Sequence, residues 1–188
     1  CGIVAAVCGS RDVRADVLAG LKTLEYRGYD SAGMAVLHDG AIDIRRKMGK
    51  IANLEKELQE NQLPSSTQAI AHTRWATHGP PADRNAHPHC DDRKDLVIVH
   101  NGIIENYLEL RQELTDRGHA FSTDTDTEIL ANLIGMYMRQ GQDLHAAVRS
   151  ALAAASGSYG LVAMAASEPD VLVVARMDSP LVIGVGES

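Results

Sequence analysis

The chain opens with Cys1-Gly2-Ile3-Val4-Ala5-Ala6-Val7, a cysteine followed at once by a run typical of a β-strand. Translation begins with methionine, so we expect processing that leaves a thiol and a free α-amine together on Cys1. A thiol with a pKa of about 8.5 is roughly 3% thiolate at pH 7, and an α-amine with a pKa of about 8 is a competent base there. The pattern predicts a terminal nucleophile activated by its own amine. The alternative is routine methionine removal before an ordinary strand residue.

The composition is that of one globular domain without a basic surface. The 188 residues are 45% hydrophobic and 23% charged, with a net charge of -7, which argues against nucleic acid as the main partner. Three cysteines, Cys1, Cys8 and Cys90, cannot form a disulfide framework. Free thiols fit a reducing compartment, so we expect a cytoplasmic protein. No apolar run reaches membrane-spanning length, and we expect no contact with a membrane.

Short β-branched runs alternate with helical patterns, which predicts antiparallel or mixed sheets covered by helices. An Asp-Gly pair at 39–40 signals a hairpin, and the Thr-x-x-Glu sequence at 125–128 has the form of a capping box. We expect a long irregular loop at 77–95, and we expect the natural chain to continue beyond the last predicted strand. The predicted strands are 2–8, 33–38, 42–47, 68–74, 96–100, 159–166, 171–176 and 181–185, and the predicted helices are 12–25, 50–60, 104–117, 125–139 and 143–155.

Polar residues follow several of the predicted apolar strands, which is where sites are usually assembled. Arg74 ends one strand, Asn101 and Gly102 end another, and Asp126 begins a helix. Each has a structural alternative: Arg74 could belong to a surface ion pair, Asn101 and Gly102 could form a turn, and Asp126 could cap the helix. Together with Cys1 they supply a nucleophile, an amide donor and opposite charges that suit an amino-acid zwitterion.

Six ordered motifs give the chain a resemblance that runs from residue 1 to about 186. They are CGIV (1–4), YRGYDSAG (26–33), RWATHG (74–79), NAHPH (85–89), VHNGIIEN (99–106) and TDTE (125–128). The sequence resembles the glutaminase domain of the glucosamine-6-phosphate synthases, the isomerising glutamine–fructose-6-phosphate aminotransferases. The resemblance implies an α+β protein with the N-terminal nucleophile hydrolase fold, a four-layer αββα sandwich with antiparallel sheets.

The resemblance also implies a reaction and a role for each site residue. Cys1 would attack the side-chain amide of L-glutamine while its amine shuttles the proton, and water would release glutamate from the thioester. The Asn101 side chain and the Gly102 backbone N–H would form the oxyanion hole. The remaining residues would be Arg74 on the α-carboxylate, Asp126 on the α-ammonium, Thr77 and His78 lining the pocket, Arg27 near the nucleophile, Trp75 gating ammonia and His87 facing a partner domain. Neither a cofactor nor a metal is implied.

In the family, two sugar-isomerase lobes with the fructose 6-phosphate site follow the glutaminase domain. These lobes are not part of the 188 residues, and we expect the glutaminase domain itself to be truncated at its C-terminal end. We therefore expect this chain alone to hydrolyse glutamine without making glucosamine 6-phosphate. We expect it to be a monomer, and the full-length enzyme to be a homodimer through the lobes. The chain has Ala5 where the family usually has glycine.

Three alternatives remain open. A phosphoribosyl-pyrophosphate-type amidotransferase shares the terminal cysteine and the Asn-Gly pair, but its pocket motif usually reads Arg-Tyr-Ser-Thr rather than Arg-Trp-Ala-Thr as at 74–77. A catalytically silent module that senses glutamine is the second. The third is a zinc site built from His72, His78, His87, His89 and Cys90. The spacing of these residues matches no usual zinc-binding motif.

Overall fold

Two four-stranded sheets form the centre of the computed structural model, which describes residues 1–186. Every pair of neighbouring strands within the sheets is antiparallel. The first sheet has the order β1 (Gly2–Val7), β4 (Gln68–Arg74), β2 (Ser31–His38), β3 (Ala41–Met48). The second has the order β5 (His89–Cys90), β6 (Leu96–Ile104), β7 (Gly157–Ala165), β8 (Val173–Met177).

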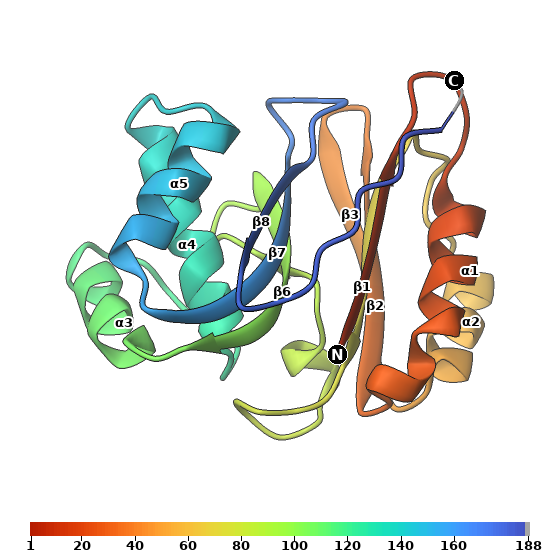
Figure 1. Ribbon diagram of the computed structural model, residues 1–188, viewed down its shortest axis with the longest axis horizontal. Helices are drawn as coiled ribbons and strands as arrows, with labels where there is room; N and C mark the ends of the chain where they lie inside the picture. Colours follow the sequence, from red (N-terminus) through yellow and green to blue (C-terminus); the bar gives the residue numbers. More distant parts are fainter. Residues whose placement is uncertain (187–188) are drawn as a thin grey trace.

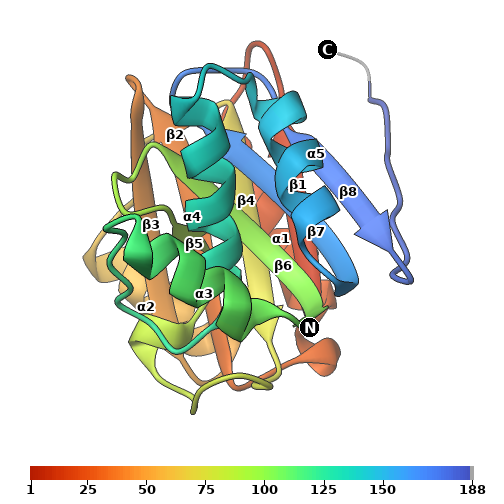
Figure 2. The ribbon, with the colours of Figure 1, turned by 90° about the vertical axis from the view of Figure 1, so that its left-hand side faces the viewer.

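Helices cover the outer face of each sheet, so that the chain forms four layers (Figures 1 and 2). Helices α1 (Arg14–Thr23) and α2 (Ile51–Glu60) lie on the first sheet. Helices α3 (Tyr107–Asp116), α4 (Asp126–Arg139) and α5 (Leu144–Ala154) lie on the second. Two short 3₁₀ turns, η1 (Glu25–Arg27) and η2 (Asp83–Asn85), join the elements. The predicted αββα sandwich is confirmed. Within residues 1–186, no helix combines the length and the apolar character needed to cross a membrane.

Strand alternation divides the buried side chains among three apolar layers. On β2, Met34 and Val36 face α1 and α2, whereas Ala35 and Leu37 face the other sheet. The strands β4 and β6 alternate in the same way, because successive side chains of a strand point to opposite faces. The layer between the sheets contains Ala35, Leu37, Ile70, Val97, Val99, Val162 and Met164, with Ile3 and Ala5 packed against it. The methyl group of Ala5 therefore lies in an apolar environment.

The strand β6 is longer than the predicted strand 96–100, and the following helix is correspondingly shorter. The predicted helix 104–117 begins only at Tyr107, because β6 continues through Asn101 and Gly102 to Ile104. Gly102 has φ +133 and pairs with Tyr159 of β7. A glycine adopts this backbone conformation readily, so an Asn-Gly pair that is typical of a turn remains inside a strand here.

The predicted strand 181–185 is wrong. These residues have no strand partner in the structure, and Val182 and Val185 are 92% and 96% exposed. The second sheet ends at β8, which pairs with β7 through Gly160–Ala163. The apolar run is typical of a strand, but a strand forms only where a neighbour supplies hydrogen-bond partners.

The helix α4 begins at the predicted capping box. The hydroxyl of Thr125 accepts a hydrogen bond from the Glu128 N–H at 3.3 Å. The Glu128 carboxylate reaches further back than in a standard box and accepts from the N–H groups of Ser122 and Thr123. This arrangement holds the loop before α4 and places Asp126 in the first turn of the helix.

Candidate active site

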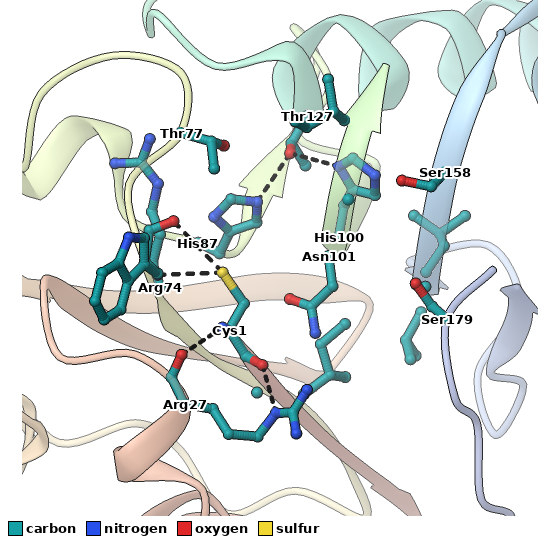
Figure 3. A pocket seen from close by; sticks show the side chains of 18 of the residues that line it. Cys1, Arg27, Arg74, Thr77, His87, His100, Asn101, Thr127, Ser158 and Ser179 are labelled. Atoms are coloured by element: carbon teal, nitrogen blue, oxygen red, sulfur yellow. Dashed lines mark hydrogen bonds between the residues drawn. The ribbon is translucent and has the colours of Figure 1, made fainter. Parts of the chain in front are cut away.

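A cavity of about 690 Å³ lies at one end of the layer between the two sheets, beside the first residue of the chain. Its wall comes from the starts of β1 and α4, the ends of β4 and β6, the first half of β7 and the segment 179–182. Figure 3 shows Cys1, Asn101, Thr77 and Arg74 around this space. Segments that are far apart in sequence thus meet at one point.

Strand alternation explains why these side chains converge. Each site residue is separated by an even number of positions from an apolar residue of the same strand or its extension. The pairs are Cys1 with Ile3 at β1, Arg74 with Ile70 on β4, and Asn101 with Val99 on β6. All three apolar residues belong to the layer between the sheets, so the polar residues beyond them point to the same side. At this end of the sandwich the apolar layer therefore gives way to a polar site.

Residue 27 holds Cys1 in place from both ends of its backbone. The α-amino group of Cys1 donates to the Arg27 carbonyl at 2.5 Å, and Arg27 Nε donates to the Cys1 carbonyl at 2.9 Å. Partial burial, followed by the charge of Arg27, lowers the pKa of this amine below its usual 8.0, while Asp30 opposes the shift. A larger fraction of the amine is therefore unprotonated near neutral pH.

The thiol of Cys1 lies against the backbone of Trp75. Its Sγ accepts a hydrogen bond from the Trp75 N–H at 3.1 Å and lies 3.5 Å from the Trp75 carbonyl oxygen. A backbone donor at this distance stabilises a thiolate relative to a thiol. The nucleophile is thus held at the end of β4, on the edge of the cavity.

The YRGYD and RWATHG motifs form one structural unit around this point. Asp30 donates its N–H to the Arg74 carbonyl at 3.0 Å, and its Oδ2 accepts from the Ala76 N–H at 2.8 Å. A Cβ on Gly28 would lie 2.7 Å from the Arg74 carbonyl carbon, so only glycine allows this close approach. Sequence reasoning had assigned no role to Gly28 or Asp30, although both belong to a motif that it singled out.

Arg74 and Asp126 supply opposite charges that are both nearly buried. Arg74 is 3% exposed and its Nη2 donates to the carbonyls of His78 and Gly79, but its Nη1 has no hydrogen-bond partner among residues 1–186. Asp126 is 4% exposed and accepts the Ile104 N–H on Oδ2 at 2.9 Å. Burial lowers the pKa of Arg74, and the negative charge of Asp126 opposes that shift. Each group retains hydrogen-bonding capacity that the protein does not use.

The structure brings most of the other predicted residues to the cavity. Thr77, Trp75, Arg27 and His87 line it. His78 is not part of the lining: its Nδ1 lies 3.9 Å from Asp126 Oδ1, and its ring meets Tyr107 edge-on.

His87 is buried beside the cavity, and its expected position facing a partner domain stays a prediction. Its Nε2 lies 2.8 Å from the Thr127 hydroxyl, which also lies 3.1 Å from His100 Nδ1 (Figure 3). Thr127 and His100 therefore join the site, and sequence reasoning did not assign them a role. The only available signal was their position inside the TDTE and VHNGIIEN motifs.

The side chains of the alternative zinc site are arranged as a packed cluster. His87 stacks on His72 with ring centroids 4.1 Å apart and meets His89 edge-on at 4.6 Å. Burial lowers the pKa of all three. In the part of the chain that the structure describes, no group of three or more His, Cys, Asp or Glu side chains is placed to hold a metal ion.

Comparisons with known proteins agree on one family. A family model described as "Glutamine amidotransferase domain" matches residues 58–156, more than half of the chain. The chain belongs to the glutamine amidotransferase domain family. Among solved structures, a glutamine phosphoribosylpyrophosphate amidotransferase from B. subtilis matches 94% of the chain with a TM-score of 0.73 and 28% identity, and covers 37% of that protein. A second solved structure, an allosteric regulatory enzyme of purine biosynthesis, matches 94% of the chain with a TM-score of 0.77 and 26% identity. The match covers 37% of that enzyme's chain.

Curated relatives with the name of an aminotransferase have a higher sequence identity to the chain. The glutamine–fructose-6-phosphate aminotransferase (isomerising) of Streptomyces coelicolor is 52% identical over the whole chain, and that of Pyrococcus horikoshii is 50% identical. The chain spans 30% and 31% of the lengths of these curated relatives. The N-terminal nucleophile hydrolase fold is confirmed by the structural neighbours.

The close packing of Gly102 predicts that an alanine at this position destabilises the fold. A Cβ there would lie 2.1 Å from the Ser158 carbonyl oxygen, in addition to the strain of φ +133. Gly118 shares a positive φ, +89, but has nothing within 4 Å. We expect Gly118→Ala to lower the free energy of unfolding by about 1–2 kcal/mol through backbone strain alone. Gly102→Ala should cost about 2 kcal/mol more, because β7 must also move. Urea unfolding of both variants measures the difference, and equal losses would contradict the close packing.

Proposed function

We propose that this domain hydrolyses the side-chain amide of L-glutamine through a thioester on Cys1, giving glutamate and ammonia. The observation that carries the proposal is the grouping around one cavity of a thiol with its own α-amine, an amide side chain and two nearly buried groups of opposite charge, Arg74 and Asp126. The family, whose model is that of a glutamine amidotransferase domain, supports the same reaction.

The two buried charges suit the amino-acid end of glutamine. Arg74 Nη1 is a buried donor without a protein partner, and a guanidinium is well suited to a carboxylate. Asp126 Oδ2 accepts the Ile104 N–H, and its Oδ1 accepts no hydrogen bond within residues 1–186 and lies 3.9 Å from His78 Nδ1. We assign the α-carboxylate to Arg74 and the α-ammonium to Asp126. Thr77 lines the same cavity, and we assign it to the wall of the substrate pocket. His78 would act through Asp126 rather than on the substrate.

The chemical step follows from the geometry of Cys1. The α-amine, with its lowered pKa, accepts the thiol proton while Sγ attacks the amide carbon. Asn101 Nδ2 and the Gly102 N–H stabilise the oxyanion of the tetrahedral intermediate. The amine then returns the proton to the leaving nitrogen, ammonia departs, and a thioester remains. Water, activated by the same amine, attacks the thioester and releases glutamate and the thiol. Arg27 holds the amine in position.

We further propose that the ammonia serves the amination of fructose 6-phosphate in a longer protein. Relatives that are identical to this chain at 52% and 50% of the aligned positions bear that name, and the chain spans only 30% and 31% of their lengths. The phosphoribosylpyrophosphate amidotransferase is 28% identical, so identity favours the fructose 6-phosphate acceptor. The partner on this view is a sugar-isomerase module, and we assign to Trp75, which is 52% exposed beside Cys1, the gating of ammonia. Dimerisation and a cytoplasmic location remain predictions.

The direct test is glutamate release from L-glutamine by the chain that begins at Cys1. We expect activity in the wild type and a loss of at least about a thousandfold in Cys1→Ala, because the nucleophile is removed. A chain with one additional glycine before Cys1 should also be inactive, since its thiol remains but its α-amine is lost. Mass spectrometry verifies each terminus. Glutamine binding without any release would indicate the silent sensing module, and activity that survives Cys1→Ala would overturn the proposal.

Asp126→Asn separates substrate binding from thiol reactivity. The asparagine can still accept the Ile104 N–H, but it loses the negative charge that we assign to the α-ammonium. A charge-assisted hydrogen bond contributes about 1.5–3 kcal/mol, so we expect the KM for glutamine to rise about 10- to 100-fold. The rate of Cys1 alkylation by iodoacetamide should be unchanged. A parallel loss of alkylation would mean that Asp126 supports the fold rather than the substrate.

The pH profile tests the amine as the base. Because burial and Arg27 lower the pKa of the Cys1 amine, kcat/KM should rise with pH with a midpoint below 8.0, as the amine loses its proton. Arg27→Gln removes a positive charge that favours the neutral amine, so the midpoint should move to higher pH. Arg27→Lys keeps the charge and is the matched control. A midpoint that stays fixed or falls in Arg27→Gln would assign the titration to another group.

A further inference from the structure

A buried histidine that takes no part in the proposed chemistry touches the oxyanion-hole side chain. His72 lies on β4, two residues before Arg74 and on the same face, and is fully buried. It pairs with Ile3 of β1 and with Gly33 of β2, so its ring crosses from the first sheet towards β6. There its Nε2 lies 2.7 Å from Asn101 Oδ1 and 3.2 Å from the His100 carbonyl oxygen.

The His100 carbonyl decides where the proton of this ring lies. A carbonyl oxygen can only accept a hydrogen bond, so Nε2 must carry the hydrogen. The Asn101 atom that faces Nε2 must then also be an acceptor, which identifies it as the oxygen of the amide. The other group on the amide carbon of Asn101 is its NH₂ group. Its NH₂ group is therefore turned away from His72, towards the cavity that Asn101 lines.

The other contacts of His72 favour the same protonation state. Burial lowers the pKa of His72 to about 3, so the ring is neutral and carries one proton. Its Nδ1 is buried without a hydrogen-bond partner among residues 1–186. A proton on Nδ1 would leave a buried donor unsatisfied and would place two acceptors, Nε2 and Asn101 Oδ1, 2.7 Å apart.

Packing holds the ring in this orientation. His72 stacks on His87 with ring planes 20° apart and centroids at 4.1 Å. His87 is in turn fixed by the Thr127 hydroxyl in the first turn of α4, at 2.8 Å from its Nε2. The ring is therefore held by β6 and, through His87, by α4, and all of these contacts are in the buried interior.

We infer that His72 is a positioning residue that locks the Asn101 side-chain amide with its NH₂ group towards the oxyanion. This inference rests on the proposed function, in which Asn101 Nδ2 is an oxyanion donor. An amide free to rotate by half a turn would present its oxygen, whose lone pairs repel the developing negative charge. The backbone carbonyl of residue 100 thus sets, through His72, the polarity of the side chain of residue 101.

Two variants separate the N–H of His72 from the volume of its ring. His72→Phe keeps an aromatic ring to stack on His87 and removes the donor, whereas His72→Gln retains an N–H in the region of Nε2. Loss of one oxyanion donor lowers rates about 10²–10³-fold. We expect His72→Phe to lower kcat for glutamine hydrolysis by about 10- to 100-fold with KM unchanged within about threefold. Cys1 alkylation should keep its wild-type rate, and His72→Gln should recover most of the lost kcat.

A double-mutant cycle with Asn101→Ala tests whether His72 acts through Asn101. In that background, His72→Phe should lower kcat by less than about twofold further, because the group it positions is already absent. Independent, multiplicative losses would overturn the inference and leave the proposed function intact. Absence of any Cys1-dependent release from the wild type would overturn both, and that measurement is made before any His72 variant.

A spectroscopic measurement tests the protonation state even if His72→Phe fails to fold. In wild-type protein with ¹⁵N-labelled histidine at pH 7.5, the shifts of His72 should report a neutral ring with the proton on Nε2. The Asn101 side-chain amide protons should be resolved and should change shift in His72→Gln more than in His38→Gln, a change at a half-exposed histidine remote from the cavity. A proton on Nδ1, or a charged ring, would overturn the inference.

Discussion

The site depends on strand alternation in two sheets that face each other. Ile3, Ile70 and Val99 belong to the apolar layer between the sheets. The same face carries Cys1 two residues before Ile3, Arg74 four residues after Ile70 and Asn101 two residues after Val99. Because side chains on one face repeat every second residue, the register that buries the apolar set also fixes the direction of the polar set. A one-residue slip of any of these strands would turn its site residue away from the cavity.

Backbone groups, rather than side-chain ion pairs, hold the reactive groups in place. The Cys1 amine and thiol contact the backbone of Arg27 and Trp75, and Asp30 ties the backbone of residues 74 and 76 to its own segment. Buried charges that form no close protein pair are costly. Arg74 and Asp126 are both nearly buried at the cavity, and within residues 1–186 Arg74 Nη1 has no hydrogen-bond partner, as is expected of a preorganised pocket.

The sequence predicted the helices of the sandwich and most strands closely, because their apolar periods are strong. β4 was predicted at its observed bounds, and α2 and α5 within one residue at each end. The predictions failed where local preference and tertiary context disagree. Asn101–Gly102 is typical of a turn, yet pairing with β7 holds it in a strand. Residues 181–185 are typical of a strand, yet no neighbour pairs with them. The stacking of His87 on His72, fifteen residues away in sequence, is a further contact that has no signal in local sequence.

The histidines illustrate the same limit in the chemistry of the site. A sequence dense in His and Cys is typical of metal ligands, but ligation requires lone pairs that converge on one point. Here the rings stack and meet edge-on instead, and their nitrogens bind Thr127, Thr125 and Asn101. Burial keeps the rings neutral, so each ring nitrogen is either a donor or an acceptor according to its neighbour. A neutral cluster orients hydrogen bonds without adding positive charge beside Cys1, so the pKa of the Cys1 amine is set by its own partial burial and by the charges of Arg27 and Asp30.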